Sequence, residues 1–190
     1  MKQKELLLAV TGGCGALIAD AIIDNSDVPV SIVASTWGKK IYEEEIGPFE
    51  GLIAKAAKVY SNENLAAEIS SGSHETSGMI IAPCSANTLA EIAGGTAGNL
   101  ISRAAHCHLK ERRPLILCVR ETPWTLMMIE NARTVTLGGG IIAPLSLPYY
   151  MLTKADSSKA DRLETLVSAY ADRILSLLGQ KCETPWTGCS

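Results

Sequence analysis

The sequence predicts an α/β fold in which helices cover both faces of one mostly parallel sheet. The first observation is that apolar runs of strand length alternate along the chain with segments of helical character. The second is that glycine or hydroxyl residues follow several of these runs, as in Thr11-Gly-Gly-Cys-Gly15 and Pro83-Cys-Ser85. Strands that alternate with helices pair in parallel through right-handed crossovers, so we expect a single-domain, Rossmann-like (flavodoxin-like) architecture.

Each expected element follows from its local pattern. Strands are expected where apolar residues run almost without a break, at residues 6–10, 28–34, 79–82, 114–119 and 140–143. Helices are expected over residues 16–23, from Ser35 through Glu45, over 121–132, and over 160–178, where the pattern is amphipathic.

Length, composition and charge exclude several classes of protein. A chain of 190 residues supports one core, so we expect one domain at residues 1–179 and a tail of different composition at 180–190. The 17 Lys and Arg against 20 Asp and Glu give a net charge of −3, which argues against nucleic acid as a partner. No apolar run approaches the ~20 residues that cross a bilayer, and no signal peptide opens the chain. We therefore expect a cytoplasmic protein with no membrane partner.

The cysteines and histidines do not predict a disulfide framework or a metal centre. The six cysteines form no CxxC pair, and several lie in apolar segments. Of the three histidines, only His106 and His108 are close in sequence, and on a helix this spacing places them on different faces. We expect no metal site.

Ligands of such sheets lie outside the carboxyl ends of the strands. Gly12, Gly13 and Cys14 form a turn at a helix start, where free N–H groups and the helix dipole favour an anion or a flat cofactor edge. Ser85 and Thr88 open a second helix in the same way. An ordinary tight turn and ordinary helix capping are the alternative interpretations of these two segments.

Arginine and lysine residues suggest a second anion site. Arg120 follows an apolar strand directly, where its planar guanidinium can meet a phosphate. Arg103, Lys110, Arg112 and Arg113 gather just before that strand, although a solvated basic face is the usual explanation of such a run. Together the two sites suggest a phosphate-bearing cofactor and a phosphate-bearing substrate.

Five segments resemble, in order and spacing, the UbiX (Pad) family of flavin prenyltransferases, which are homo-oligomeric FMN-binding flavoproteins. They are Ser71-Gly-Ser-His-Glu-Thr-Ser-Gly-Met79, Pro83-Cys-Ser85, Leu109-Lys-Glu-Arg-Arg-Pro-Leu115, Val119-Arg-Glu-Thr-Pro123 and Pro148-Tyr-Tyr150. The resemblance runs from about residue 5 to residue 179. It implies a metal-independent enzyme that joins the dimethylallyl group of dimethylallyl monophosphate or diphosphate to N5 and C6 of reduced FMN. The prenylated FMN would serve a UbiD-type decarboxylase. The resemblance also implies a dodecamer with sites shared between subunits.

The resemblance assigns expected roles to residues by position. Residues expected to hold FMN are Gly12, Gly13, Cys14, Ser35, Ser85, Thr88, Arg103 and Arg120. Residues expected to grip the substrate phosphate are Lys110, Arg120, Tyr150 and Arg173. Glu45, Glu121 and Lys110 are expected to be catalytic. Glu121 is a candidate acceptor of the C6 proton, or alternatively the partner of Arg120 in a structural ion pair.

One departure from the family keeps other functions open. Cys14 occupies a position where the family usually has Ser, and a thiol is the weaker hydrogen-bond donor. A non-catalytic flavin carrier is therefore one alternative. An FMN-dependent cysteine decarboxylase is another, because Ser85-Ala-Asn-Thr88 resembles a motif of those enzymes, but no His precedes His74 to act as their early base.

Overall fold

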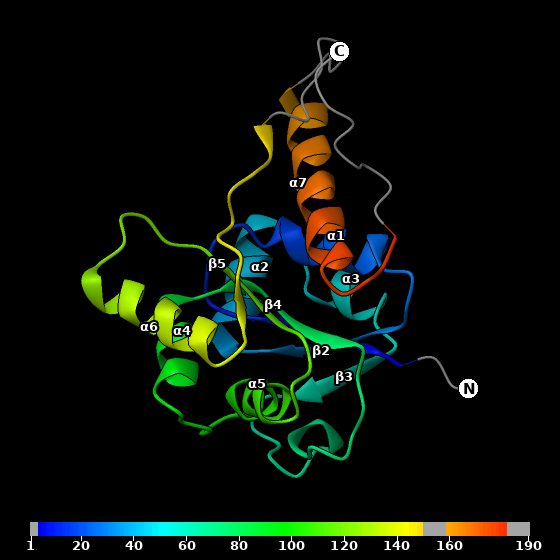
Figure 1. The fold of residues 1–190 in the computed structure, drawn as a ribbon. Helices are drawn as coiled ribbons and strands as arrows, with labels where there is room; N and C mark the ends of the chain where they lie inside the picture. The colour runs from blue at the N-terminus through cyan, green and yellow to red at the C-terminus, as the bar shows by residue number, and fades with distance from the viewer. Residues whose placement is uncertain (1–3, 150–158, 182–190) are drawn as a thin grey trace.

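The computed structural model describes residues 4–149 and 159–181. Six strands form one sheet in the order β3-β2-β1-β4-β5-β6, and every neighbouring pair is parallel (Figure 1). The strands are β1 (Leu6–Val10), β2 (Val30–Ala34), β3 (Lys58–Ser61), β4 (Gly78–Cys84), β5 (Leu115–Val119) and β6 (Ile141–Ile142). The chain winds outward from β1 to β3 and then returns to the other side of β1 at β4. This is the doubly wound order, and it confirms the predicted α/β fold.

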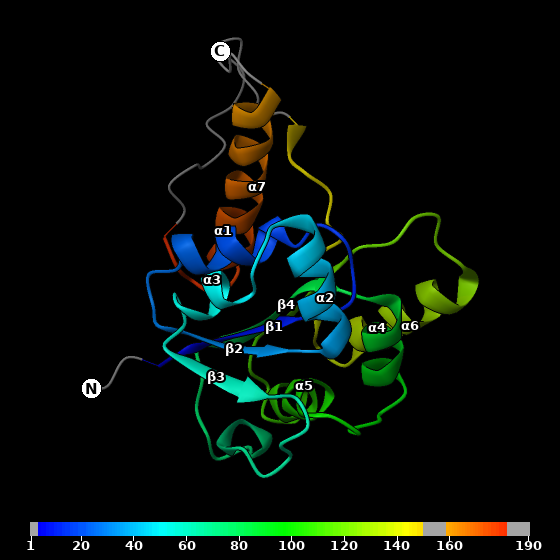
Figure 2. The same ribbon diagram turned by 180° about the vertical axis from the view of Figure 1, so that it is seen from behind.

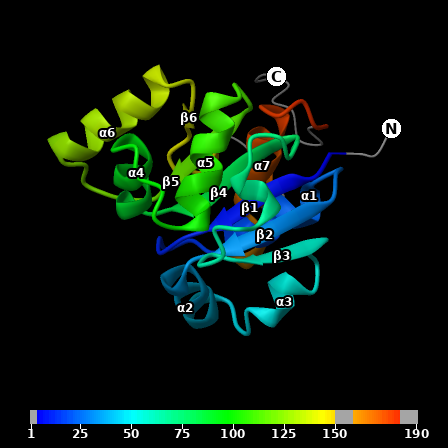
Figure 3. The same cartoon turned by 90° about the horizontal axis from the view of Figure 1, so that it is seen from below.

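Helices cover the sheet on both faces. They are α1 (Leu17–Asn25), α2 (Thr36–Glu45), α3 (Glu50–Ile53), the 3-10 helix η1 (Glu68–Ser70), α4 (Ala86–Ala93), α5 (Leu100–Lys110), α6 (Leu126–Leu137) and α7 (Lys159–Ser176). Figure 2 shows α1, α3 and α7 on one side of the sheet and α4 and α5 on the other. Seen from below, α5 lies over the sheet, with α4 and α6 at one end and α2 and α3 at the other (Figure 3). None of the helices in the described part of the chain is long and apolar enough to span a membrane.

The strand β1 divides the core into two layers. Leu6, Leu8 and Val10 point to the face that carries α1 and α7, whereas Leu7 and Ala9 point to the face that carries α4 and α5. All five side chains are buried. Because each fully buried Leu stabilises the fold by about 1.5–3 kcal/mol, this continuous apolar run fixes β1 at the centre of the sheet.

Two expectations about the elements require correction. The edge strand β3 was not predicted, because only Tyr60 of its four residues is buried and no apolar run marks it. The helix expected over residues 121–132 begins instead at Leu126 and continues to Leu137. Its start is fixed by the Thr125 side chain, which accepts a hydrogen bond from the Met128 N–H at 3.3 Å. The preceding residues are thereby free to line a cavity.

Candidate functional site

Thr11 joins the carboxyl ends of β1 and β4 at the point where the strand order reverses. Its hydroxyl donates to the Pro83 carbonyl at 2.9 Å and accepts from the Ser85 N–H at 2.8 Å. The glycines that follow permit a close approach of neighbouring chain: a Cβ at Gly12 would lie 2.9 Å from the Trp37 Cβ. The topological switch point is therefore a tightly connected pair of turns, where doubly wound proteins bind ligands.

A cavity of about 410 Å³, which we call the hydroxyl cavity, opens at this point. Gly12, Ser35, Ser85 and Thr88 line it, so four of the residues predicted to hold FMN lie together. Ser35 and Ser85 cap α2 and α4, where they accept from the N–H groups of Gly38 at 3.0 Å and Thr88 at 3.2 Å. Capping uses the oxygen lone pairs only, so the Ser35 hydroxyl proton can still be donated to a ligand. The Ser85 hydroxyl lies 3.0 Å from the Thr88 hydroxyl, and when Thr88 donates to it the Ser85 proton is available to a ligand as well. Two helix N-termini therefore favour an anion here.

The second cavity has a volume of about 860 Å³, and we call it the apolar cavity. Cys14, Glu45, Arg120 and Glu121, all predicted site residues, lie on its wall. Most of the remaining wall is aliphatic and comes from α1, the end of β5, the segment after β6, and α7: Leu17, Ile18, Val119, Leu145, Leu147, Leu163 and Val167. The arrangement suits a ligand with an apolar body and an anionic end.

Glu45 occupies the N-terminus of α1. Its carboxylate accepts hydrogen bonds from the backbone N–H groups of Gly15 at 2.9 Å and Ala16 at 2.7 Å. The turn at residues 12–14 was expected to bind an anion of a ligand. In this structure the anion at the helix start is the Glu45 carboxylate. The N-termini of α2 and α4, at the hydroxyl cavity, remain candidates to receive a ligand phosphate.

Arg120 and Glu121 extend from the end of β5 into the apolar cavity. The Arg120 N–H donates to the Cys84 carbonyl at 3.1 Å, which holds this strand end beside β4. The Glu121 carboxylate accepts from the Thr122 N–H at 3.0 Å. No salt bridge joins Arg120 to Glu121, although both belong to the described part of the chain. Both charged groups are therefore available to a ligand.

Two ionisable side chains in the core close to the apolar cavity, Cys118 and Tyr170, are neutral at neutral pH. Burial raises the pKa of the Cys118 thiol to about 12, so this cysteine is not a nucleophile at neutral pH. The Tyr170 hydroxyl donates to the Ala143 carbonyl at 2.8 Å and thereby fixes the segment that leads from β6 into the cavity wall. Burial also raises the pKa of Tyr170.

Three predicted basic residues lie outside both cavities in one copy of the chain. Arg103 is exposed on α5 and donates to the Ser70 carbonyl at 3.0 Å. Lys110 ends α5 near the amino end of β5 and pairs with Glu111. Arg173, on α7, lines a third hollow, which shares Ser146, Leu147 and Tyr149 with the apolar cavity.

The remaining predicted residues are placed as follows. Gly13 lies between the two cavities, where an added Cβ would be 3.3 Å from the Pro83 Cβ and 3.7 Å from the Arg120 Cβ. Tyr150 lies outside the described residues. The roles assigned to all of the predicted site residues stay predictions.

Sequence reasoning missed part of the hydroxyl cavity. Asn62, Glu91 and Asn99 line it, and the Asn99 side chain donates to Glu91 at 3.0 Å. Asn62 follows the unpredicted strand β3. The one local signal was the spacing of Asn99 and Ser102, which form a capping box at the start of α5.

Comparisons with known proteins agree with this geometry. The Flavoprotein family model matches residues 1–172. The flavin prenyltransferase UbiX of Deinococcus radiodurans is 43% identical over 149 residues, which are 76% of each chain. The crystal structure of AnUbiX (PadA1) in complex with FMN and dimethylallyl pyrophosphate matches with a TM-score of 0.91 and 33% identity over 100% of both chains.

A second solved structure is the dodecameric FMN-dependent UbiX-like decarboxylase from Escherichia coli O157:H7. It matches with a TM-score of 0.85 and 32% identity, and the match covers 97% of this chain and 100% of that one. These similarities extend over both cavities and the strand ends between them. The chain belongs to the flavoprotein family, within its UbiX flavin prenyltransferase group.

Proposed function

We propose that this protein is a flavin prenyltransferase that makes prenylated FMN from reduced FMN and dimethylallyl monophosphate or diphosphate. The observation that carries the proposal is the position of the two cavities at one switch point. The hydroxyl cavity presents two helix N-termini, and the apolar cavity presents Arg120 among aliphatic side chains. An overall match at a TM-score of 0.91 to AnUbiX with FMN and dimethylallyl pyrophosphate supports this pairing.

The hydroxyl cavity is the proposed site of the FMN phosphate. Ser35 and Ser85 would donate their hydroxyl protons to the phosphate oxygens, and the dipoles of α2 and α4 would stabilise its charge. Gly12 and Gly13 would let the flavin approach the main chain closely, and Cys14 would contact its edge. The flavin ring would extend from there toward the apolar cavity, which contains Cys14 and Glu45.

In the apolar cavity, Arg120 is the proposed stabiliser of the departing phosphate. When the allylic C–O bond breaks, the electron pair leaves with the phosphate, and a guanidinium in a water-excluding site stabilises the growing charge. Leu145, Leu147 and Val167 would hold the dimethylallyl group and exclude water. The N5–C bond would form with loss of the N5 proton. The ring would then close when the double bond of the allyl group gains a proton and C6 attacks the resulting tertiary cation, after which C6 loses a proton, so ring closure leaves the composition unchanged. Glu121 is the proposed acceptor of the C6 proton.

The active assembly is proposed to be a homo-oligomer, as in the dodecameric relative. Lys110 and Arg103 lie on exposed parts of α5, so their proposed roles at the phosphates require a neighbouring copy. Helix α6 also exposes apolar side chains, with Leu126 at 71% and Met127 at 74%, which a second copy would cover. A cytoplasmic location is part of the proposal, since reduced FMN and a UbiD-type decarboxylase must be available.

A coupled assay tests the proposed function. The protein is incubated anaerobically with reduced FMN and a dimethylallyl phosphate, and a protein-free filtrate is added to a UbiD-type decarboxylase that lacks its cofactor. Decarboxylase activity that requires the allyl phosphate is the expected result. Activation by FMN alone would favour a flavin carrier. Release of CO₂ from a peptide with a C-terminal cysteine would favour a cysteine decarboxylase.

A further inference from the structure

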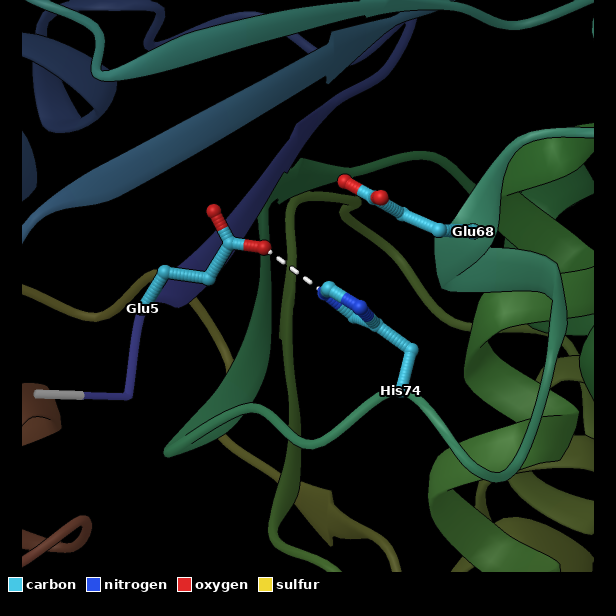
Figure 4. Close-up of side chains that lie close together, drawn as sticks. All are labelled: Glu5, Glu68 and His74. Carbon is cyan, nitrogen blue, oxygen red and sulfur yellow. Dashed lines mark hydrogen bonds and ion pairs between the residues drawn. The ribbon is translucent and has the colours of Figure 1, made fainter. Parts of the chain in front are cut away.

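Three metal-binding side chains converge at the amino edge of the sheet, opposite the strand ends that form the candidate site. Glu5 immediately precedes β1, Glu68 belongs to η1, and His74 lies in the loop before β4. Figure 4 shows the three side chains pointing toward one another from these separate segments. One potential ligand atom of each lies within 4.8 Å of the other two. Segments far apart in sequence thus bring one imidazole and two carboxylates to one position.

Neighbouring side chains hold two of these groups in place. The His74 Nε2 and the Glu5 Oε1 are 2.8 Å apart, and the other Glu5 oxygen accepts from the hydroxyl of Ser31, a residue that is 0% exposed. The Tyr60 hydroxyl donates to Glu68 at 2.6 Å. Hydrogen bonds of this kind fix the orientation of metal ligands and are part of a metal site's affinity.

Lys58 is the one cation that pairs directly with this group in the described structure. Its ammonium lies 2.5 Å from a Glu68 oxygen, and the two side chains are 50% and 48% exposed. Lys58 and Tyr60 both donate hydrogen bonds to the Glu68 carboxylate. An exposed ion pair contributes little, and the flexible lysine can turn toward solvent when a divalent ion competes for Glu68.

We propose that Glu5, Glu68 and His74 form a structural site for a divalent first-row transition metal, with Zn²⁺ the best-fitting ion. One imidazole and two carboxylates suit Zn²⁺, whereas Mg²⁺ and Ca²⁺ prefer oxygen ligands alone. In binding, the metal replaces the hydrogen bond between His74 and Glu5, the proton of that hydrogen bond is released to solvent, and water completes the coordination. The ion connects the start of β1 to the loop before β4. It has no part in prenyl transfer, which takes place at the other edge of the sheet.

Titration calorimetry of the full chain with ZnCl₂, after treatment with EDTA and removal of the chelator, tests the proposal. The expected stoichiometry is one ion per chain. His74→Phe and the nearly isosteric Glu5→Gln should each weaken binding by at least about tenfold. His106→Phe is the matched control, since His106 lies on α5 and contacts the Thr96 carbonyl. This substitution should not affect Zn²⁺ binding. Far-ultraviolet circular dichroism establishes that each variant is folded.

Lys58→Met supplies the sharper comparison. Removing the competing ammonium should tighten Zn²⁺ binding, whereas adventitious binding at a surface histidine would not respond. Zn²⁺ should also raise the melting temperature of the wild type but not of His74→Phe. An affinity that His74→Phe leaves unchanged, or that Lys58→Met does not increase, overturns the proposal. The EDTA-treated protein should still prenylate FMN, so this result is independent of the proposed function.

Discussion

The carboxylate of Glu45, at the end of α2, caps the start of α1 by accepting the Ala16 N–H at 2.7 Å. The contact ties the glycine turn after β1 to the end of α2. It thereby sets the shape of the cavity wall beside Cys14.

Glu45→Gln should therefore weaken both stability and catalysis. An amide has one acceptor oxygen and no charge, so it satisfies the helix start less well, at a cost of about 0.5–2 kcal/mol of unfolding free energy. We expect a lower urea midpoint and slower prenyl transfer. Glu44→Gln is the matched control, because Glu44 lies on the same helix, whereas the N–H groups of Gly15 and Ala16 donate to Glu45. Equal behaviour of the two variants would contradict the role of Glu45.

Arg120→Gln should reduce prenyl transfer by about 10²–10³-fold, as expected for the loss of a donor that stabilises developing charge. Steady-state kinetics with varied dimethylallyl phosphate measure the effect on kcat and KM. Arg133→Gln on α6, where Arg133 faces Glu130, serves as the control for loss of a positive charge. Wild-type turnover by Arg120→Gln would exclude Arg120 from the reaction.

Glu121→Gln should stop the reaction between its two bond-forming steps. The amide cannot accept the C6 proton, so a flavin alkylated at N5 without ring closure should accumulate. The absorption spectrum and fragmentation of the quenched flavin distinguish it from the closed product. Glu130→Gln controls for loss of a nearby exposed carboxylate. Ring closure at the wild-type rate in Glu121→Gln would show that another base, such as the released phosphate, accepts the C6 proton.

Gly12→Ala should weaken FMN binding through a specific clash. The new Cβ would lie 2.9 Å from the Trp37 Cβ at the edge of the hydroxyl cavity, so one of the two backbones must move. Fluorescence titration of the apoprotein with FMN measures the affinity. Trp37→Gly removes the opposing Cβ, and the double variant Gly12→Ala/Trp37→Gly should recover part of the loss. If the double variant binds FMN no better than Gly12→Ala, the clash with Trp37 is not the cause of the weaker binding.

His108 should make folding stability depend on pH. Its Nδ1 lies 2.8 Å from the Ala104 carbonyl, which only accepts, so Nδ1 carries the proton and Nε2 accepts from the Thr76 hydroxyl at 2.7 Å. Burial lowers the pKa of His108 to about 4 from its usual 6.5. The unfolded chain therefore binds more protons between these values, and stability falls as the pH is lowered through this window.

Urea unfolding at pH 7.5 and 4.5 measures this dependence. The shift corresponds to a loss of about 2–3 kcal/mol in the wild type, at about 1.4 kcal/mol per pH unit. His108→Gln should be less stable at neutral pH but should lose less on acidification, whereas His106→Gln should behave like the wild type. An identical pH slope in all three proteins would show that His108 is not the group responsible.

The sequence predicted the centre of the fold and of the site better than their periphery. The apolar run of β1 and the turn at Gly12 are local patterns, and parallel pairing brings their neighbours Ser35 and Ser85 to the same edge. The strand β3 was not predicted, because three of its four residues are exposed and it therefore contains no apolar run. The contact of Glu45 with Ala16 joins residues far apart in sequence, so no spacing rule reveals it.

The same reason explains the side chains at the amino edge. The proposed metal site was not expected from the sequence, because Glu5 and Glu68 belong to other segments than His74 and only folding brings the three together. The position of Lys110 could not be predicted for a different reason, since its assigned role depends on a neighbouring copy of the chain. The sequence pattern of one chain predicts neither the convergence of distant segments nor a contact between copies.

The proposed reaction attaches a dimethylallyl group to FMN. Mass spectrometry of the flavin released after anaerobic incubation with reduced FMN and, in separate reactions, dimethylallyl monophosphate and diphosphate tests it most directly. We predict a flavin heavier by one dimethylallyl unit with at least one donor, which also identifies that donor. Unmodified FMN with both donors would exclude prenyl transfer to FMN as the activity of this protein.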